Sequence, residues 1–274
     1  AKVAAFAARG TQRMNDTARK PVALVTGARR GIGAGIAKAL AGRGFDLVLA
    51  DIEAGPEADA VVKAVGSLNR RAQFIRADIA DIAGLEAFVD QAWQAFGTLD
   101  CLVNNAGVQV KTRGDLLDVT QESFDHLMAV NVRGTFFLTQ EVARRMAAEK
   151  RAPGAPHRSI VTISSVNAVT AAINRGEYCI SKSALTMMNK LFALRLAEHG
   201  VHCYEIRPGV IATEMTAPAK QRYDKFIAEG NIPIARWGTP QDIGEAIATL
   251  ASGGLAFSTG DAFAIDGGLH IAKM

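Results

Sequence analysis

A serine, a tyrosine and a lysine have the types and the spacing that proton transfer would need. They lie in residues 159–182, which read SIVTISSVNAVTAAINRGEYCISK. The β-branched start of this segment predicts a buried strand that ends at Ser164 and Ser165, where an α/β sheet places its chemistry. Tyr178 and Lys182 are four residues apart, so on a helix they share one face. A hydroxyl, a phenol and an ammonium could together move a proton without a carboxylate, a histidine or a metal.

The composition restricts the class of protein. The 274 residues, 49% of them hydrophobic, suffice for one sizeable α/β domain. Three widely spaced cysteines in apolar segments predict reduced thiols and a cytoplasmic protein. The histidines show no metal-ligand spacing, so no metal is expected. The net charge of +4 is dispersed, and no apolar run reaches the ~18 residues of a membrane helix. We therefore expect neither a nucleic acid nor a membrane as partner.

Two basic segments carry no motif. Residues 1–20 are rich in arginine and lysine and hold a single acid, Asp16. Such a start is typical of a transit peptide, but a plain surface tail fits as well, and we expect a tail. The second segment, residues 150–158, reads KRAPGAPHR and is expected to be a solvated loop.

The order of elements near the start of the chain predicts a nucleotide site. Residues 22–26 predict a short buried strand, TGARRGIG follows at 26–33, and after a helix a second strand ends at Asp51. The glycines would let the backbone approach a pyrophosphate at the helix N-terminus. Asp51 lies 18 residues after Gly33, near the ~20 expected of an acid that binds the adenosine ribose. This pattern predicts a dinucleotide-binding βαβ unit.

The glycine spacing is TGxxxGxG, and together with later motifs it resembles the short-chain dehydrogenase/reductase family. The motifs are TGARRGIG, Asp78 in RADI, NNAG at 104–107, Asn131 in NVRG, Ser165, YCISK, RPGVIAT and DGG at 266–268. The resemblance covers residues 21–268. It implies a single α/β domain at 21–274, after the tail at 1–20. The implied fold is a doubly wound Rossmann fold, with a mainly parallel sheet of about seven strands flanked by helices. It also implies a substrate lid at about 213–238 and a homo-oligomer, either a tetramer or a dimer.

The same resemblance assigns site residues to this sequence. Ser165 is preferred to Ser164 because it precedes Tyr178 by the family's 13 residues. The implied catalytic residues are Asn131, Ser165, Tyr178 and Lys182. The implied cofactor-binding residues are Gly27, Arg29, Arg30, Gly31, Ile32, Gly33, Asp51, Asp78, Ile79, Asn105, Ala106, Gly107, Tyr178, Lys182, Pro208, Gly209, Ile211 and Thr213.

The implied roles centre on Tyr178, which is the general acid in reduction and the general base in oxidation. A free tyrosine titrates near pH ~10. The Lys182 ammonium and an oxidised nicotinamide are expected to lower its pKa. Ser165 is expected to donate a hydrogen bond to the substrate oxygen. Asn131 is expected to kink its helix and to hold a water on its main-chain carbonyl.

Two further assignments concern the frame of the site. Asn104 is expected to tie the sheet together. Asp78 is expected to hold the adenine or to cap the next helix, and both roles are compatible.

Four lid residues are expected either to line a pocket or to pack the lid down; they are Met215, Tyr223, Phe226 and Trp237. The apolar C-terminal residues 270–274 are expected to pack at a subunit boundary.

The residues near the ribose disagree about the cofactor. Asp51 would repel a 2′-phosphate and accept hydrogen bonds from a free 2′-hydroxyl, which favours NAD. Arg29 and Arg30 favour NADP, because a basic residue before the second glycine often marks phosphate binding in this family. We expect NAD, since the acid at the strand end meets the ribose directly.

The expected reaction is NAD(P)-dependent interconversion of a secondary alcohol and a ketone by hydride transfer. Asn167, Asn174, Arg175 and Glu177 surround the catalytic group and could suit a polyol, a sugar acid or a hydroxy acid, or could form a solvated rim. One alternative is a 3-oxoacyl-carrier-protein or acyl-CoA reductase that uses NADPH. Another is a dinucleotide-binding regulator without turnover, but the intact catalytic set argues against it.

Overall fold

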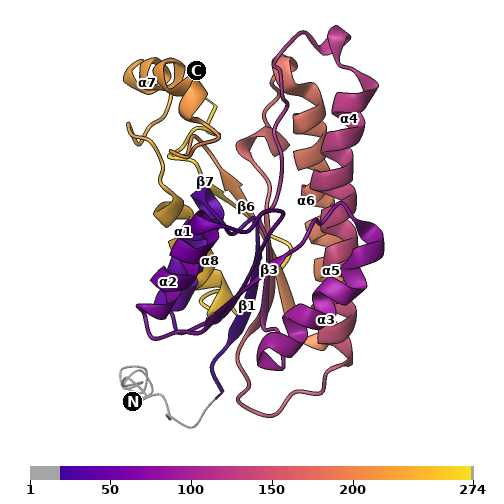
Figure 1. Cartoon of the computed structure of the whole chain (residues 1–274). Coiled ribbons are helices and arrows are strands. Elements are labelled where there is room, and N and C mark those ends of the chain that lie inside the picture. The colour runs from indigo at the N-terminus through magenta and orange to yellow at the C-terminus, as the bar shows by residue number, and fades with distance from the viewer. Residues whose placement is uncertain (1–18, 273–274) are drawn as a thin grey trace, which may run out of the picture.

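Seven parallel strands form one sheet at the centre of the molecule (Figure 1). The computed structural model describes residues 19–272. Along the sheet the strands follow the order β3-β2-β1-β4-β5-β6-β7. The strands are β1 (Val22–Thr26), β2 (Asp46–Asp51), β3 (Ala72–Arg76), β4 (Cys101–Asn104), β5 (Arg158–Ile163), β6 (Val201–Pro208) and β7 (Ala262–Ile265). Strands β1, β4 and β5 are buried along their whole length, as parallel strands covered on both faces must be.

Helices cover both faces of the sheet. One layer packs on the first apolar cluster and comprises α1 (Gly31–Gly42), α2 (Pro56–Gly66) and α8 (Pro240–Ala251). The other comprises α3 (Leu85–Phe96), α4 (Gln121–Leu127), α5 (Thr135–Ala148) and α6 (Gly176–Leu196), and α3, α5 and α6 supply the second cluster. The two layers stand on opposite sides of the sheet (Figure 1). The doubly wound Rossmann fold predicted from the sequence is confirmed. No helix within residues 19–272 is both long and apolar enough to cross a membrane.

The chain changes direction across the sheet between β1 and β4. From β1 it winds outward to β2 and β3, then returns to β4 beside β1 and winds the other way. In such sheets the crevice at this switch point, beyond the carboxyl ends of the strands, is where ligands bind. Thr26 ends β1, Asn104 ends β4 and Ile163 ends β5. The predicted site residues therefore follow strand ends that meet at one edge.

Short non-α helices shape the connections around this edge. The segment η3 (Met128–Gly134) is a π-helix between α4 and α5, at the position where the sequence predicts a kink at Asn131. A π-turn inside a helix is uncommon and is frequent at functional sites. The remaining segments are η1 (Ile82–Gly84), η2 (Leu116–Asp118), η4 (Val166–Ala168), η5 (Ile173–Arg175), η6 (Ala197–His199) and η7 (Ala217–Ala219).

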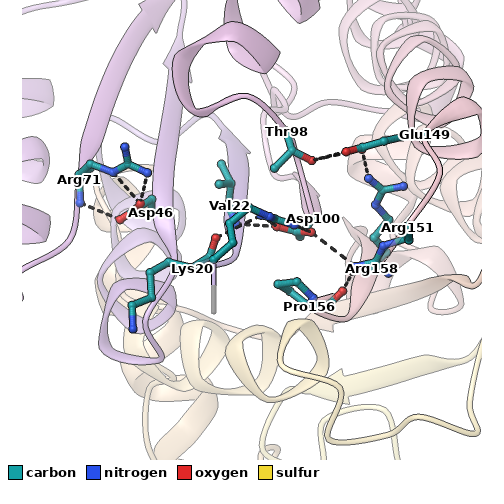
Figure 2. A network of polar contacts seen from close by, with 11 residues as sticks. Lys20, Val22, Asp46, Arg71, Thr98, Asp100, Glu149, Arg151, Pro156 and Arg158 are labelled. Atoms are coloured by element: carbon teal, nitrogen blue, oxygen red, sulfur yellow. Dashed lines mark hydrogen bonds and ion pairs between the residues drawn. The ribbon is translucent and has the colours of Figure 1, made fainter. Parts of the chain in front are cut away.

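A buried polar network closes the opposite, amino-terminal edge of the sheet (Figure 2). Asp100 is fully buried and accepts hydrogen bonds from the main-chain amide of Val22 (2.9 Å) and from Arg19 (2.7 and 2.8 Å). Arg158, 1% exposed, donates to the carbonyl of Met146 (2.7 Å) and pairs with Glu149. The loop at 150–158 is thus not simply solvated, because its last residue begins β5 inside this network.

The lid segment, residues 213–238, leaves and rejoins the domain at one place. Ile211 and Gly238 form a short parallel bridge, in which Gly238 donates to Val210 and Ala212 donates to Gly238, both at 2.9 Å. Between these ends the segment carries α7 (Lys220–Ala228), which stands apart from the two helix layers (Figure 1).

The predicted tail lies outside the described residues as far as residue 18, and it stays a prediction, as does the packing of the C-terminal residues.

Candidate active site

The glycine-rich turn after β1 is built for close backbone approach. Gly31 has φ +53°, a left-handed conformation that favours glycine. A Cβ on Gly33 would lie 2.0 Å from the carbonyl oxygen of Gly27, so no side chain fits there. Within the described chain no side chain caps α1 and no acid occupies its first turn. The first amides of α1 and its dipole are thus available to an anion, and the turn fits a dinucleotide pyrophosphate.

Asp51 lies at the end of β2 next to this turn. Its carboxylate accepts a hydrogen bond from the main-chain amide of Arg29 at 3.2 Å. The guanidinium of Arg29 lies 3.9 Å from Asp51, 2.8 Å from Glu53 and 2.5 Å from Glu57. Arg29 is therefore held among three carboxylates, while Arg30 is exposed. The environment of the expected ribose position is acidic overall.

Threonine and asparagine side chains join the ends of β1 and β4. Thr26 Oγ1 accepts from the main-chain amides of Asn105 and Ala106, both at 3.1 Å. Asn105 Nδ2 donates to the carbonyls of Thr26 and Gly27, both at 2.9 Å. Thr26 belongs to the glycine motif, but the sequence analysis assigned it no role. The structure makes it the residue that fixes the second backbone segment of the cofactor site against the first.

Two framing predictions can be compared with the structure. Asn104 Nδ2 donates to the hydroxyls of Thr139 (2.8 Å) and Thr162 (3.3 Å), so Asn104 does tie β4 to α5 and β5. Asp78 is exposed, and its carboxylate accepts from the amide of Ala80 at 2.8 Å. Asp78 thus caps a turn but not the next helix, because Asp81 is the N-cap of η1, so that prediction is wrong. The predicted contact of Asp78 with the adenine stays a prediction.

The predicted catalytic side chains come together at the end of β5. Ser165 is hydrogen-bonded to the phenol of Tyr178. Lys182 Nζ lies 5.7 Å from the centre of the Tyr178 ring and donates to the carbonyl of Ile163 at 3.1 Å. Ser165, Tyr178 and Lys182 are all buried. The serine at the end of the strand therefore lies beside the tyrosine and the lysine of the next helix, as the sequence predicts.

Asn131 fixes the loop that faces these residues. Its side chain exchanges two hydrogen bonds with the backbone of Val108, at 2.8 and 3.0 Å, and donates to Ser181 at 3.1 Å. A Cβ on Gly107 would lie 3.1 Å from Asn131 Oδ1 and 3.3 Å from Lys182 Nζ. Asn131 thus connects the loop after β4 with α6. The water expected on its main-chain carbonyl stays a prediction.

The pKa of Tyr178 differs from the sequence expectation. Burial is the largest influence and raises its pKa above the ordinary value, while the Ser165 hydrogen bond and the charge of Arg175 act to lower it. Lys182 is not among the causes. Burial also lowers the pKa of Lys182 to about 8, opposed by the charge of Glu205. The charge that opposes burial and lowers the pKa of Tyr178 is thus that of Arg175.

Glu205 is a buried residue that the sequence analysis did not find. It is 1% exposed and accepts from the hydroxyls of Ser164 (2.5 Å) and Thr186 (2.9 Å) and from Arg207 (2.7 Å). These contacts join β5, α6 and β6 beside the catalytic group. No local motif marks Glu205, since Ser164 and Thr186 are distant in sequence and only Arg207 is close, two residues further along β6.

The last of the predicted cofactor-binding residues, 208–213, lie at the end of β6 and directly after it. A Cβ on Gly209 would lie 2.6 Å from the Cβ of Asp266, so the backbone packs closely there. The carbonyl of Ile211 accepts from Thr216 at 2.7 Å. Thr213 and the exposed Glu214 come near the glycine turn, each with a side-chain atom 3.5 Å from where a Gly31 Cβ would lie. The turn and the lid segment thus meet at the expected diphosphate position.

Most of the lid residues pack the lid. Tyr223, Phe226 and Trp237 surround a small apolar cluster in this segment, and the Tyr223 and Trp237 rings meet edge to face with centres 5.6 Å apart. Met215 is 58% exposed.

Residues 19–272 contain no group of three or more histidine, cysteine or acidic side chains that could hold a metal ion.

Several known proteins resemble this chain over most of its length. A family model described as enoyl-(acyl carrier protein) reductase matches residues 27–270. The 2-dehydro-3-deoxy-D-gluconate 5-dehydrogenase of Dickeya dadantii is 36% identical over 90% of this chain and 94% of its own. The L-rhamnose 1-dehydrogenase (NAD(P)(+)) of Sphingomonas is 30% identical over 90% and 95%. The crystal structure of a 3-oxoacyl-[acyl-carrier protein] reductase from Brucella melitensis in complex with NAD superposes with a TM-score of 0.90, at 48% identity over 93% of this chain and 99% of that one.

The chain belongs to the short-chain dehydrogenase/reductase family. It is an NAD(P)-dependent oxidoreductase that interconverts a secondary alcohol and a ketone. Proteins of this kind bind NAD or NADP.

Proposed function

We propose that Tyr178 transfers the proton of this reaction and that Ser165, Lys182 and Asn131 support it. The observation that carries the proposal is the convergence of Ser165, Tyr178 and Lys182 at the end of β5. Because burial raises the pKa of Tyr178, the phenol is protonated at neutral pH and can act as general acid toward a ketone oxygen. Ser165 then donates the second hydrogen bond to that oxygen and positions it.

Lys182 and Asn131 serve the proton path in this proposal. The Lys182 ammonium has three N–H donors and uses one of them on Ile163. The other two are available to the nicotinamide ribose and to the phenolate that forms when Tyr178 gives up its proton. Asn131 holds the loop that faces Lys182 and leaves its own carbonyl for a water. When bound, the nicotinamide supplies or accepts the hydride.

We propose NAD as the preferred cofactor. Arg29, the best candidate for a 2′-phosphate ligand, is already paired with Glu53 and Glu57 and lies beside Asp51. A 2′-phosphate would have to displace these pairs and approach three carboxylates, whereas a free 2′-hydroxyl can donate to Asp51. The preferred direction of the reaction is then oxidation of a secondary alcohol.

A 3-oxoacyl-carrier-protein reductase is the second candidate. The similarity to the Brucella melitensis reductase supports it, and that protein's complex with NAD makes the activity compatible with the proposed cofactor. A regulator without turnover is disfavoured because all four catalytic residues are present and three of them converge.

We also propose that the protein is a homo-oligomer. On α6 the side chains of Ile180, Met187, Leu191 and Leu194 are 49–81% exposed, and their spacing places them along one side of the helix. An exposed apolar stripe of this kind is typical of a subunit interface. A second copy of the chain, as a dimer or a tetramer, would cover it.

Tyr178→Phe tests the proposed mechanism. The substitution removes the transferable proton but keeps the ring, so turnover of any ketone or alcohol substrate should fall at least about a thousandfold. NADH binding, followed by fluorescence titration, should change less than about threefold, because the cofactor's main contacts are elsewhere. Turnover retained within tenfold of wild type would contradict the assignment of Tyr178.

A further inference from the structure

Three arginines gather around the mouth of the catalytic site. Arg175 belongs to η5 and directly precedes α6, Arg222 lies on α7, and Arg113 lies in the loop between β4 and η2. The Arg175 guanidinium lies 5.7 Å from the centre of the Tyr178 ring. Segments far apart in sequence therefore bring positive charge next to the reacting group.

Tyr223 of the lid connects these arginines. Its hydroxyl is hydrogen-bonded to Arg113, and the Arg222 guanidinium lies 4.8 Å from the centre of its ring. Burial raises the pKa of Tyr223, but the charges of Arg175, Arg113 and Arg222 together lower it below the ordinary value. Arg175 also acts on Tyr178 in the same direction. One guanidinium thus faces both phenols, one from the lid and one from the catalytic group.

The positive charge at this mouth is not neutralised by the protein. Within residues 19–272 no carboxylate forms an ion pair with Arg113, Arg175 or Arg222. Arg175 is half-buried, and its Nε is buried without a hydrogen-bond partner. The nearest acid in sequence is Glu177, which is buried and accepts from Ser123 at 2.9 Å. A half-buried, unpaired guanidinium is costly and favours an anionic ligand with which it can form two parallel hydrogen bonds.

We propose that the substrate carries a carboxylate, bound by Arg175 with the help of Arg113 and the Tyr223 hydroxyl, a few carbons from the alcohol or ketone carbon that faces Tyr178. This inference rests on the proposed function and names the class of substrate. A small oxo or hydroxy acid fits better than a carrier-bound acyl chain. A carrier protein could reach the exposed Arg113 and Arg222, but it would leave the half-buried Arg175 unpaired.

The test compares acids with their uncharged analogues. The rate of reduction by NADH is measured for 4-oxopentanoate and 5-oxohexanoate and, under the same conditions, for the primary amide of each. The amides have the same shape as the acids but carry no charge. Wild type should prefer at least one acid over its amide by tenfold or more in kcat/KM. Arg175→Gln should lower kcat/KM for that acid about 10- to 100-fold and change the amide less than threefold. Arg175→Lys keeps the charge but loses the planar guanidinium that can form two parallel hydrogen bonds. Its kcat/KM for the acid should lie between those of wild type and Arg175→Gln.

Two controls separate this inference from a loss of structure and from the proposed function. Arg195→Gln removes the same charge from the last turn of α6, far from Tyr178, and should leave the preference unchanged. Calorimetry of 4-oxopentanoate on NADH-loaded Tyr178→Phe, with and without Arg175→Gln, measures binding without turnover. The acid should bind only when Arg175 is present.

Two results would overturn the inference while leaving the oxidoreductase mechanism intact. The first is that Arg175→Gln leaves the ratio of kcat/KM for the acid to kcat/KM for the amide unchanged. The second is that wild type prefers the amides, or prefers the acetoacetyl thioester of N-acetylcysteamine, which represents a carrier-bound acyl chain. If wild type reduced no ketone, the proposed function would fail, and the calorimetry would still decide whether Arg175 binds a carboxylate.

Discussion

The ammonium of Lys182 donates a hydrogen bond to the carbonyl oxygen of Ile163 at 3.1 Å. Ile163 is the last residue of β5, and Lys182 lies one turn after Tyr178 on α6. This contact fixes the helix against the strand end that carries Ser165. It also places the ammonium in a buried position, where its charge is poorly solvated.

The first prediction follows from the pKa of Lys182, which burial lowers to about 8 from the ordinary value of 10.5. Between these values the unfolded chain holds the proton and the folded chain does not, so this group makes stability rise with pH from about 8 to about 10.5. Lys182→Met should remove that rise, which amounts to about 3 kcal/mol. Urea titrations of both proteins at pH 7, 8, 9 and 10 measure it. A constant difference between the two proteins across this range would contradict the buried charge.

The second prediction concerns cofactor choice. Wild type should bind NADH at least tenfold more tightly than NADPH, because Asp51 lies at the expected ribose position and Arg29 is already paired with Glu53 and Glu57. In Asp51→Ala the affinity for NADH should exceed the affinity for NADPH by about threefold or less, because the carboxylate that would repel a 2′-phosphate is gone. Asp59→Asn removes an exposed carboxylate from α2 and serves as the matched control. Tighter binding of NADPH by wild type would favour the acyl-thioester reductase.

The third prediction concerns the glycine turn. Gly33→Ala places a methyl group 2.0 Å from the Gly27 carbonyl oxygen, so the turn must open. NADH affinity should fall at least tenfold, and the protein should lose about 1–3 kcal/mol of stability. Gly42→Ala adds the same methyl group at the end of α1, where no atom lies within 4 Å, and should be neutral or slightly stabilising. Equal NADH affinity in the two variants would argue against this packing.

The fourth prediction concerns the buried acid beside the site. Glu205→Gln leaves Arg207 without its carboxylate and should cost about 3–5 kcal/mol in free energy of unfolding. Arg207→Gln alone should also destabilise the protein, but the double variant should be less destabilised than the two single effects combined, because neither charge is then left unpaired. Thermal and urea unfolding of the four proteins measures the coupling. Strict additivity would show that the pair acts independently.

The elements and most of the candidate site could be predicted because their signals are local. The glycine turn, Asp51 at a strand end and the four-residue step from Tyr178 to Lys182 each lie within a short stretch of chain. The mainly parallel sheet of about seven strands follows from the resemblance, and the structure confirms it. Ser165 could be distinguished from Ser164 only by its distance from Tyr178, and in the structure Ser165 contacts the phenol whereas Ser164 contacts Glu205.

The rest depends on tertiary contacts between distant segments. Glu205 contacts Ser164 just after β5 and Thr186 on α6 as well as its neighbour Arg207, and no sequence motif joins it to the first two. Arg113 and Tyr223 are 110 residues apart in the sequence, yet they meet at the mouth of the site. The raised pKa of Tyr178 depends on how deeply the phenol is buried. Burial of this kind is a property of the packed molecule and cannot be read from residue types.

The bridge between Ile211 and Gly238 has a consequence for how this enzyme can change. The two ends of the lid segment are fastened to each other, and between them the segment contacts the rest of the domain at a few further places. Ile234 donates a hydrogen bond to the carbonyl of Gly267 at 2.9 Å, and Tyr223 is hydrogen-bonded to Arg113. The length and sequence between those ends can vary at a small cost in loop-closure entropy. The residues after Thr213 and Glu214, which contact the glycine turn, can therefore be exchanged more freely than the rest of the domain. Replacing them, in evolution or by grafting from a relative, can give the enzyme a new substrate range without a change in the glycine turn.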